Sequence, residues 1–270
     1  MTTVAEALRQ ARAQGLDRAD AMALLGALLA RSRTWLLTHD DAPLDDAQQA
    51  RWQDWLARRQ DEVPVAYLTG QHEFHGLMLA VTPDVLDPRP DTETLVDWAL
   101  EHLPPQGSAV DLGTGSGAIA LALKSQRPEA LVGAVDASAE ALAVARANAE
   151  RLQLPVHFVQ GHWLSGVRGP FDLIVSNPPY IAEDDPHLDQ LGHEPRMALT
   201  SGVDGLDALR TIIAQAPAHL QPGGWLLLEH GWQQAEAVRD LLTQTGFVQV
   251  QSRRDLAGIE RCSGGQWPGG

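Results

Sequence analysis

The stretch Ala109–Leu123, AVDLGTGSGAIALAL, decides the fold that we expect for this chain. It begins with a short apolar run, turns through three glycines and continues with helical spacing. A strand, a glycine-rich loop and a helix open a doubly wound nucleotide-binding domain, because glycine lets the backbone approach a ligand closely. The next apolar run ends in Asp136, whose carboxylate can accept hydrogen bonds from ribose hydroxyls. We therefore expect a nucleotide-like ligand at this loop, rather than a tight turn without one.

The glycine spacing leaves two cofactor classes open. Gly113, Gly115 and Ala118 satisfy the dinucleotide pattern G-x-G-x-x-A, so spacing alone does not exclude NAD. Asp111 precedes the loop, where a dinucleotide site needs no carboxylate beside its pyrophosphate. Gly117 completes D-x-G-x-G-x-G, the pattern of S-adenosylmethionine sites. These two residues favour S-adenosylmethionine.

A second motif, Asn-Pro-Pro-Tyr at Asn177–Tyr180, follows the apolar run Phe171–Ser176. The two prolines fix φ and remove two N–H donors, and Pro178 pushes Asn177 toward extended backbone. The Asn177 side-chain oxygen and the backbone carbonyls remain as acceptors beside an aromatic ring. This group suits a flat NH₂ group, either a carboxamide or the exocyclic amine of a base, although the tetrapeptide also occurs in ordinary loops.

Length and composition indicate one large domain and a small one. The chain has 270 residues, 44% of them hydrophobic, and no apolar run approaches the roughly 20 residues that span a bilayer. The single cysteine, Cys262, excludes an internal disulfide and fits a reducing compartment. A net charge of −15 disfavours a partner bound mainly through phosphates. We expect a cytoplasmic monomer without a signal peptide, a membrane anchor or direct nucleic-acid contact. We also expect no metal, because His72 and His75 have suitable spacing but no third ligand accompanies them.

The chain changes character near residue 60. Residues 1–60 predict a small bundle of three helices, with Asp17 and Asp45 as N-caps of the second and third. Pro64–Gly70 predicts a break, and residues 73–81 predict a β-hairpin. No phosphate-binding glycines or catalytic cluster occur before the hairpin.

Beyond the hairpin, a helix over 95–100 with Asp91 or Thr92 as its cap precedes a regular alternation of strands and helices. Strands are expected at 109–112, 131–135, 156–159, 171–176, 224–230 and 247–251, and helices at 117–125, 138–152, 204–219 and 232–244. Such alternation predicts a mostly parallel sheet. The tail 263–270 is low in complexity.

Seven motifs, in order along the chain, carry a family resemblance. They are Pro64-x-x-Tyr67-Leu68-x-Gly70, Pro88-Arg89-Pro90-Asp91-Thr92-Glu93, the loop Asp111–Gly117, Asn177–Tyr180, Glu194-Pro195-x-x-Ala198-Leu199, Gly202-x-Asp204-Gly205-Leu206 and Asp255-x-x-Gly258-x-x-Arg261. Together they resemble the protein-(glutamine-N5) methyltransferases that modify peptide chain release factors, the PrmC/HemK family. The resemblance implies an α/β fold, the Rossmann-like doubly wound sheet of class I S-adenosylmethionine-dependent methyltransferases. It also implies a helical substrate-recognition domain over 1–72, a hairpin linker over 73–86 and a methyltransferase domain over 87–270.

The resemblance also implies an activity. A methyl group would pass from S-adenosylmethionine, leaving S-adenosylhomocysteine, to the side-chain amide nitrogen of the glutamine in the Gly-Gly-Gln motif of class-1 release factors. The residues implied to bind the cofactor are Gly113, Thr114, Gly115, Ser116 and Gly117 at the methionine portion, Asp136 at the ribose, Trp163 at the adenine and Asn177, which bridges to the substrate. Asn177, Pro178, Pro179 and Tyr180 would hold the amide, with Asn177, Pro178 and Tyr180 as catalytic residues. Relatives often have an acid immediately before the tryptophan, where this chain has His162.

Two other functions stay open. Adenine-N6 and guanine-N2 methyltransferases of nucleic acids also carry Asn-Pro-Pro-Tyr, although the acidic composition counts against them. A binding protein that has lost catalysis is disfavoured by the intact glycine loop and by Asn177. The tripeptide Gly264-Gly265-Gln266 repeats the motif of the family's substrates. We expect a coincidence, the alternative being a flexible tail that visits the Asn177 pocket as a weak substrate.

Three further residues have two interpretations each. Phe74 is a candidate aromatic wall of the substrate pocket, although a core position is favoured. Glu194 is expected to pair with Arg196 or a backbone group, and Arg89 either anchors its loop or faces the site.

Overall fold

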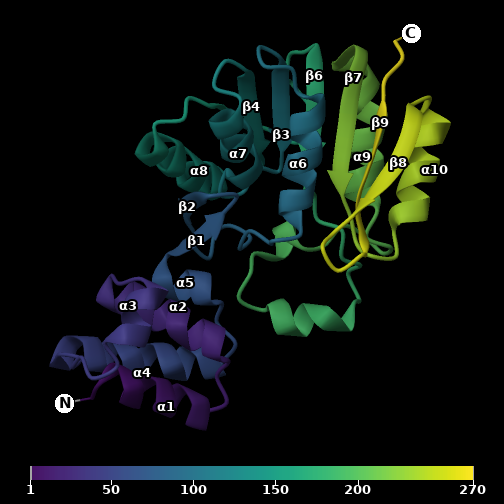
Figure 1. The fold of residues 1–270 in the computed structure, drawn as a ribbon. Helices are drawn as coiled ribbons and strands as arrows, with labels where there is room; N and C mark the ends of the chain where they lie inside the picture. The colour runs from purple at the N-terminus through teal and green to yellow at the C-terminus, as the bar shows by residue number, and fades with distance from the viewer. Residues whose placement is uncertain (1, 270) are drawn as a thin grey trace. The chain divides into compact units, whose positions relative to one another are not determined.

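The computed structural model describes residues 2–269 and divides into two compact units, Met1–Gln71 and His72–Gly270 (Figure 1). The division falls between Gln71 and His72, and nearly all of the hairpin lies in the second unit. The finer three-part division, with the hairpin as a separate linker, stays a prediction. Within the described residues, no helix is long and apolar enough to cross a membrane.

The N-terminal unit is helical. Its helices are α1 (Val4–Ala13), α2 (Arg18–Leu29), α3 (Arg33–Thr38), α4 (Asp46–Gln60) and α5 (Val65–Thr69).

Two of the caps predicted in this unit are present. The Asp17 carboxylate accepts the Ala19 N–H, and the Asp45 carboxylate accepts the Gln48 N–H. The stretch Pro64–Gly70, expected to mark a break, lies directly before the division between the two units but is itself helical. Pro64 starts the short helix α5, and Gly70, in the left-handed region at φ 73°, ends it.

The hairpin predicted from the sequence is formed by β1 (Gln71–Phe74) and β2 (Leu77–Ala80). His75 and Gly76 connect the strands with positive φ of 49° and 78°, as a two-residue hairpin turn requires. Phe74 is buried in the core of the second unit, so its favoured interpretation as a core residue is the correct one.

The second unit is a twisted sheet between helices, which confirms the doubly wound fold. Its further elements are α6 (Thr92–His102), β3 (Ser108–Leu112), α7 (Ala118–Gln126), β4 (Leu131–Asp136), α8 (Ala139–Leu152), β5 (His157–Gln160), β6 (Phe171–Ser176), α9 (Asp207–Gln215), β7 (Leu220–Glu229), α10 (Ala235–Thr245), β8 (Val248–Arg254) and β9 (Glu260–Gln266). The strand order is β5-β4-β3-β6-β7-β9-β8, and only β9 runs antiparallel to its neighbours. The order reverses at β3, so the carboxyl ends of β3, β4 and β6 meet where such sheets bind ligands.

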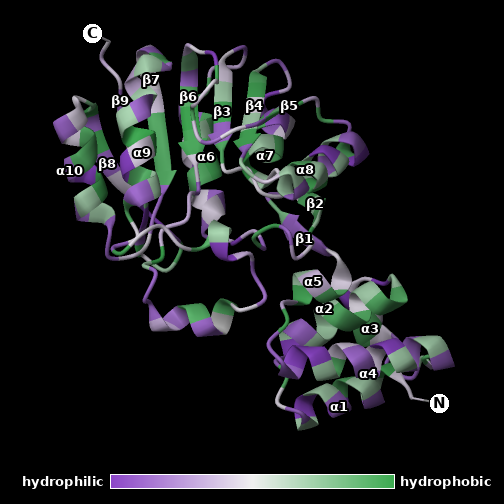
Figure 2. Ribbon diagram, turned by 180° about the vertical axis from the view of Figure 1, so that it is seen from behind, coloured by the Kyte–Doolittle hydropathy of each residue, from purple (hydrophilic) through white to green (hydrophobic). Residues whose placement is uncertain are grey.

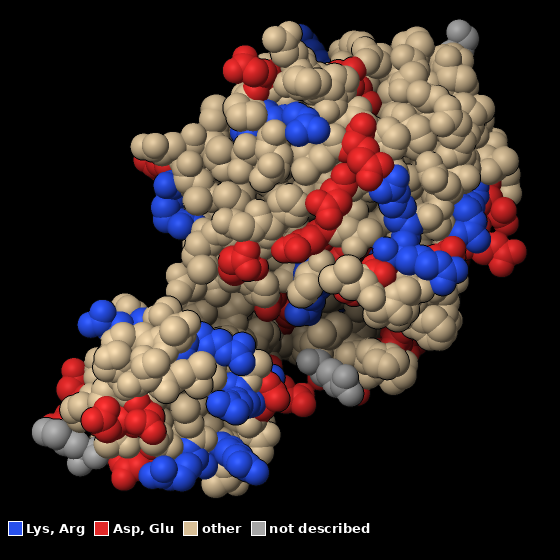
Figure 3. Space-filling view, in the orientation of Figure 1, with Lys and Arg blue, Asp and Glu red and all other residues tan. Residues whose placement is uncertain are grey.

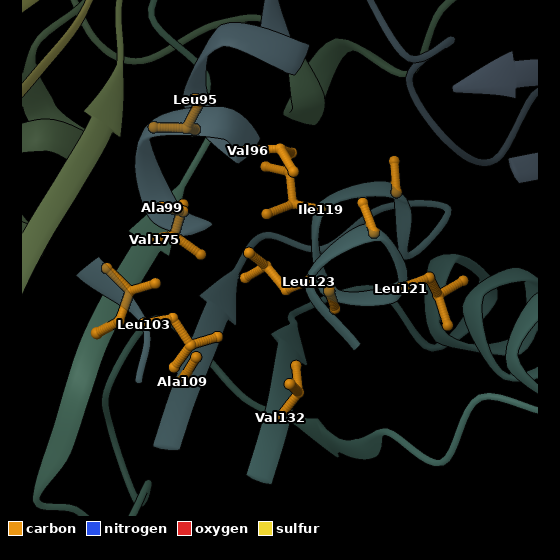
Figure 4. Close-up of a cluster of buried hydrophobic side chains, with 14 of the residues drawn as sticks. Leu95, Val96, Ala99, Leu103, Ala109, Ile119, Leu121, Leu123, Val132 and Val175 are labelled. Carbon is orange, nitrogen blue, oxygen red and sulfur yellow. The ribbon is translucent and has the colours of Figure 1, made fainter. Parts of the chain in front are cut away.

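Alternate residues of the central strands pack into two separate cores. Ala109 of β3 and Val175 of β6 share a core with residues of helices α6 and α7, while Val110 and Ile174 share the other core with residues of α9 and α10. Figure 4 shows the first core, and Figure 2 shows that the central strands are hydrophobic along most of their length. Strands buried on both faces are typical of parallel sheets, and they hold the loops at their ends rigidly.

The C-terminal tail differs most from expectation. Residues expected to be low in complexity and flexible form β9, which lies buried between β7 and β8. A Cβ on Gly264 would lie 2.5 Å from the Leu226 carbonyl oxygen, so the closely packed sheet requires glycine there. The Gln266 side chain accepts a hydrogen bond from Gln249 and donates one to the Gly223 carbonyl. The idea of a mobile tail that reaches the Asn177 pocket was therefore wrong.

Candidate functional site

A cavity of about 380 Å³ lies at the carboxyl ends of β3, β4 and β6, within the size range of small-molecule sites. Six of the residues singled out in the sequence line it: Gly113, Gly115, Asp136, Trp163, Asn177 and Pro179. Thr114, Ser116 and Gly117 are buried behind it, and Pro178 and Tyr180 lie beside it. The two sequence motifs, 60 residues apart, thus meet at one site.

The glycine loop exposes backbone to the cavity. Gly113, Gly115 and Gly117 have φ of 71°, 53° and 85°, values that side chains strongly disfavour. The N–H groups of Gly113 and Thr114 both donate to the Val135 carbonyl, which ties the loop to β4. The loop therefore presents a wall of backbone to the cavity at Gly113 and Gly115, while the side chains of Thr114 and Ser116 are buried.

A buried carboxylate lies beneath this wall. Asp111 is fully buried and its Oδ2 accepts a 2.6 Å hydrogen bond from the Thr114 hydroxyl. Its Oδ1 has no hydrogen-bond partner among the described residues, and burial raises the pKa of Asp111 to about 7. An unpaired buried oxygen of this kind is costly unless a ligand donates to it.

Asp136 is a carboxylate held by the backbone. The Gly115 N–H donates to its Oδ2 at 2.8 Å and the Ser138 N–H donates to its Oδ1 at 2.9 Å. The Ser138 hydroxyl in turn caps α8 by accepting the Ala141 N–H. Each oxygen keeps a further lone pair, so the carboxylate can accept hydrogen bonds from a ligand in the cavity.

The tryptophan predicted at the site lies on the glycine loop. A Cβ on Gly113 would meet the Trp163 ring at 3.3 Å, so the close approach of ring and backbone requires glycine. Trp163 itself has a positive φ of 53°, an uncommon conformation for a bulky residue, which suggests a functional constraint. The preceding His162 is exposed and lines the same cavity, so no carboxylate stands immediately before the tryptophan.

The Asn-Pro-Pro-Tyr turn is anchored on both sides. The Ser176 hydroxyl donates to the Leu112 carbonyl at 2.6 Å, which locks the ends of β6 and β3 together. The Asn177 Nδ2 donates to the Thr92 hydroxyl at 3.2 Å, so its Oδ1 is left to accept hydrogen bonds. The Pro178 carbonyl accepts no backbone hydrogen bond from the residues that the structure describes.

Tyr180 is the last residue of the turn, and its hydroxyl is hydrogen-bonded within the protein. Its Oη donates to Glu229 Oε1 at 3.4 Å, and its carbonyl accepts the Gln234 Nε2. Burial is the main cause that raises the pKa of the Tyr180 phenol above its ordinary value, so the phenol stays neutral. Tyr180 therefore offers a ring face rather than an ionisable group.

The comparisons with known proteins agree with this geometry. A family model described as Methyltransferase small domain matches residues 91–253, and one described as PrmC N-terminal domain matches residues 2–70. The chain is 54% identical to a release factor glutamine methyltransferase of Bordetella pertussis over 93% of its length and 95% of the relative's. It is 51% identical to a protein of the same name in Burkholderia pseudomallei over 99% and 97%.

The chain belongs to the release factor glutamine methyltransferase family. Solved structures extend the likeness only to the fold. A methyltransferase of Pyrococcus furiosus matches with a TM-score of 0.57 and 22% identity, over 83% of this chain and all of that one. A Thermus thermophilus 16S rRNA methyltransferase, solved with AdoMet and guanosine, matches with a TM-score of 0.56 and 20% identity, over 73% and 49%.

Three contacts of this family member were missed or misassigned in the sequence. Asp91 or Thr92 was expected to cap α6; Asp91 occupies the N-cap position without a side-chain hydrogen bond, and the Thr92 hydroxyl accepts the Asn177 amide. Glu229 was not singled out at all. The one sequence signal for Glu229 is its position at the end of the first strand that follows Asn-Pro-Pro-Tyr. Glu194 pairs with Arg89, whose Nη2 lies 2.7 and 2.8 Å from its two oxygens, and not with Arg196.

Charged side chains of both signs are mixed on one face of the molecule. In the face shown in Figure 3, arginine and lysine side chains are interspersed with acidic ones on both units. Binding to a nucleic acid backbone relies on clustered basic side chains. The curated relatives disfavour the nucleic-acid alternative.

Proposed function

We propose that this protein transfers a methyl group from S-adenosylmethionine to the side-chain amide nitrogen of the glutamine in the Gly-Gly-Gln motif of class-1 release factors. The proposal depends on the orientation of the Asn177 amide. Its NH₂ donates to the Thr92 hydroxyl, so its oxygen is left to accept hydrogen bonds at a cavity of nucleotide size. The names of the relatives supply the substrate class, and the site chemistry agrees with it.

The residues present fit S-adenosylmethionine. Asp136 is placed to accept the ribose hydroxyls, and Trp163 offers a ring face for the adenine. The wall of backbone at Gly113 and Gly115 admits the methionine portion, and the unpaired Asp111 Oδ1 suits a cationic amino group near it. S-adenosylmethionine supplies an electrophilic methyl group on a positively charged sulfur.

The chain's own task is to position a poor nucleophile. An amide nitrogen shares its lone pair with the carbonyl, and no protein side chain is a strong enough base to deprotonate it. Asn177 Oδ1 and the Pro178 carbonyl would accept the two N–H groups of the substrate amide, which adds electron density to nitrogen and fixes its direction. Such orientation can recover on the order of 7–11 kcal/mol of barrier. The nitrogen becomes acidic after transfer, so its proton passes to water.

The Tyr180 ring and the prolines limit water around the amide. A weakly polar pocket favours a step in which a positive charge disappears, because the ground state is the more strongly solvated species. Pro178 is buried, and Pro179 and Tyr180 are half-buried, consistent with this role.

The test is mass spectrometry of a class-1 release factor after incubation with the enzyme and labelled S-adenosylmethionine. We expect one added methyl group on the motif glutamine and none when that glutamine is replaced by alanine. Label on DNA or RNA, with none on the release factor, would support the nucleic-acid alternative instead.

A further inference from the structure

A buried carboxylate behind the Asn-Pro-Pro-Tyr turn is the group that the proposed mechanism does not use. Glu229 ends β7 next to the end of β6, where Ser176 pairs with Leu228. It is 1% exposed, and it lines no part of the cavity. A buried acid this close to a reaction site needs an explanation, because a carboxylate is rarely buried without a partner.

Glu229 is incompletely paired. The Tyr180 hydroxyl donates to its Oε1 at 3.4 Å, and its Oε2 has no hydrogen-bond partner among the described residues. Burial raises the pKa of Glu229 to about 7, while interactions with the Thr92 and Tyr180 hydroxyls favour the charged form. A carboxylate with this pKa changes charge near neutral pH, and the Tyr180 and Thr92 hydroxyls are the two that favour its charged form.

Thr92 connects this acid to the site. Its oxygen already accepts the Asn177 NH₂ at 3.2 Å, so its own proton needs a different acceptor. Glu229 is the candidate acceptor, because an interaction with the Thr92 hydroxyl favours its charged form. A charged carboxylate can only accept, so it directs the Thr92 proton toward itself and turns the Thr92 lone pair toward Asn177.

We propose that Glu229 is a positioning residue that, through Thr92, holds the Asn177 amide with its oxygen toward the substrate. Without a charged acceptor, the Thr92 proton is free to bond to Asn177 Oδ1, and the amide then turns its NH₂ toward the substrate. An NH₂ group cannot accept the substrate N–H, so the flipped enzyme binds the cofactor but does not transfer the methyl group. This inference rests on the proposed function.

The titratable groups around Glu229 come from the start of α6 and from β9. Asp91 at the start of α6 raises the pKa of Glu229 and Arg261 of β9 lowers it. Arg261 also lies 3.4 Å from Asp91 and 3.1 Å from Asp255, so part of its charge is already balanced. Cys262, which faces Glu229 across the β7–β9 pair, has a thiol pKa raised mainly by burial and stays neutral.

The decisive experiment measures kcat on a release factor from pH 5.5 to 9, with cofactor affinity by calorimetry. We expect wild-type kcat to rise about tenfold per pH unit up to about pH 7 and then to level off. Glu229→Gln and Thr92→Val should each lower kcat at least tenfold at pH 8, leave cofactor affinity within twofold and lose the rise near pH 7. The double variant should be no slower than the slower single variant, because both act through one contact.

Two further variants separate positioning from folding. Thr92→Ser keeps the hydroxyl and should retain kcat within threefold of wild type and the rise near pH 7. Ser263→Ala removes a buried hydroxyl of neighbouring β9 that binds His230 instead, and should leave kcat unchanged. Near-normal kcat in Thr92→Val, or no recovery in Thr92→Ser, would overturn the inference. Failure of the proposed function would look different, because the wild-type enzyme would then leave the glutamine unmethylated.

Discussion

Asn177 has its amide NH₂ bound by Thr92 and its oxygen free, so removal of its side chain deletes the acceptor without disturbing the core. We expect Asn177→Ala to lower kcat at least a hundredfold, since orientation of the amide is the main catalytic device. Cofactor affinity should change less than fivefold. Single-turnover methylation with calorimetry on the same sample measures both, and near-normal kcat would place the amide acceptor elsewhere.

Asp136 is expected to contribute to binding rather than to turnover. Asp136→Ala removes a charged acceptor proposed for the ribose, and hydrogen bonds to charged groups contribute roughly 1.5–3 kcal/mol. Cofactor affinity should therefore fall about ten- to hundredfold. Asp240→Ala, on the exposed surface of α10, is the matched control. Equal affinities in the two variants would move the ribose site to another residue.

The raised pKa of Glu229 also predicts that the free energy of unfolding depends on pH. Its folded pKa of about 7 lies above its ordinary value of 4.5, so the folded state holds the proton more tightly than the unfolded state. The stability that this proton adds is fully present below pH 4.5 and is lost as pH rises through 7. Glu229→Gln removes this cost and should stabilise the protein at pH 8 by on the order of 1–3 kcal/mol. Thermal unfolding at pH 8 and at pH 4.5 checks the sign. The gain should be absent at the lower pH.

At the scale of elements, β9 shows what sequence patterns miss. The strands β3, β4 and β6 were predicted to within one residue because apolar runs buried on both faces leave a clear signal. β9 contains Ser263, Gly264 and Gly265, which lack that signal and resemble a loop. The small residues are there because Trp98 and Phe247 pack directly against the backbone.

This packing gives a prediction for β9. Gly264→Ala would place its Cβ 2.5 Å from both Leu226 O and a Leu227 methyl, so it should destabilise the fold by about 1–3 kcal/mol. Gly133→Ala is the control, because its Cβ would have no neighbour closer than 3.8 Å in the equally central β4. Urea unfolding of both variants makes the comparison. Equal stabilities would show that β9 is not packed as described.

The site residues could be predicted only in part, because some of them belong to no local sequence motif. Asp136, Trp163 and Asn177 belong to local motifs, and each lies at the cavity. Thr92 and Glu229 act through contacts 85 and 49 residues away in the chain, with Asn177 and Tyr180 respectively. Only the folded sheet brings those partners together.

At the scale of the whole molecule, the N-terminal unit is the part whose purpose the cofactor site does not explain. Every residue that lines the cavity lies at or beyond Asp84, and the second unit contains both of the cores that support the sheet. The first unit has a hydrophobic core of its own, built around Leu24, Leu25 and Trp52. Separate cores are what independently folding domains possess.

Deleting residues 1–70 should therefore spare cofactor binding, with an affinity within threefold of the full chain. We expect methylation of an intact release factor to fall at least tenfold, because a large folded substrate requires contacts beyond the reacting glutamine to offset the entropy of association. A short peptide with the Gly-Gly-Gln motif is the internal control, and its slower methylation should be the same with either enzyme. If both substrates lost activity equally, the deletion would have damaged the methyltransferase unit itself. Full activity on the intact factor would show that recognition lies entirely in residues 71–270.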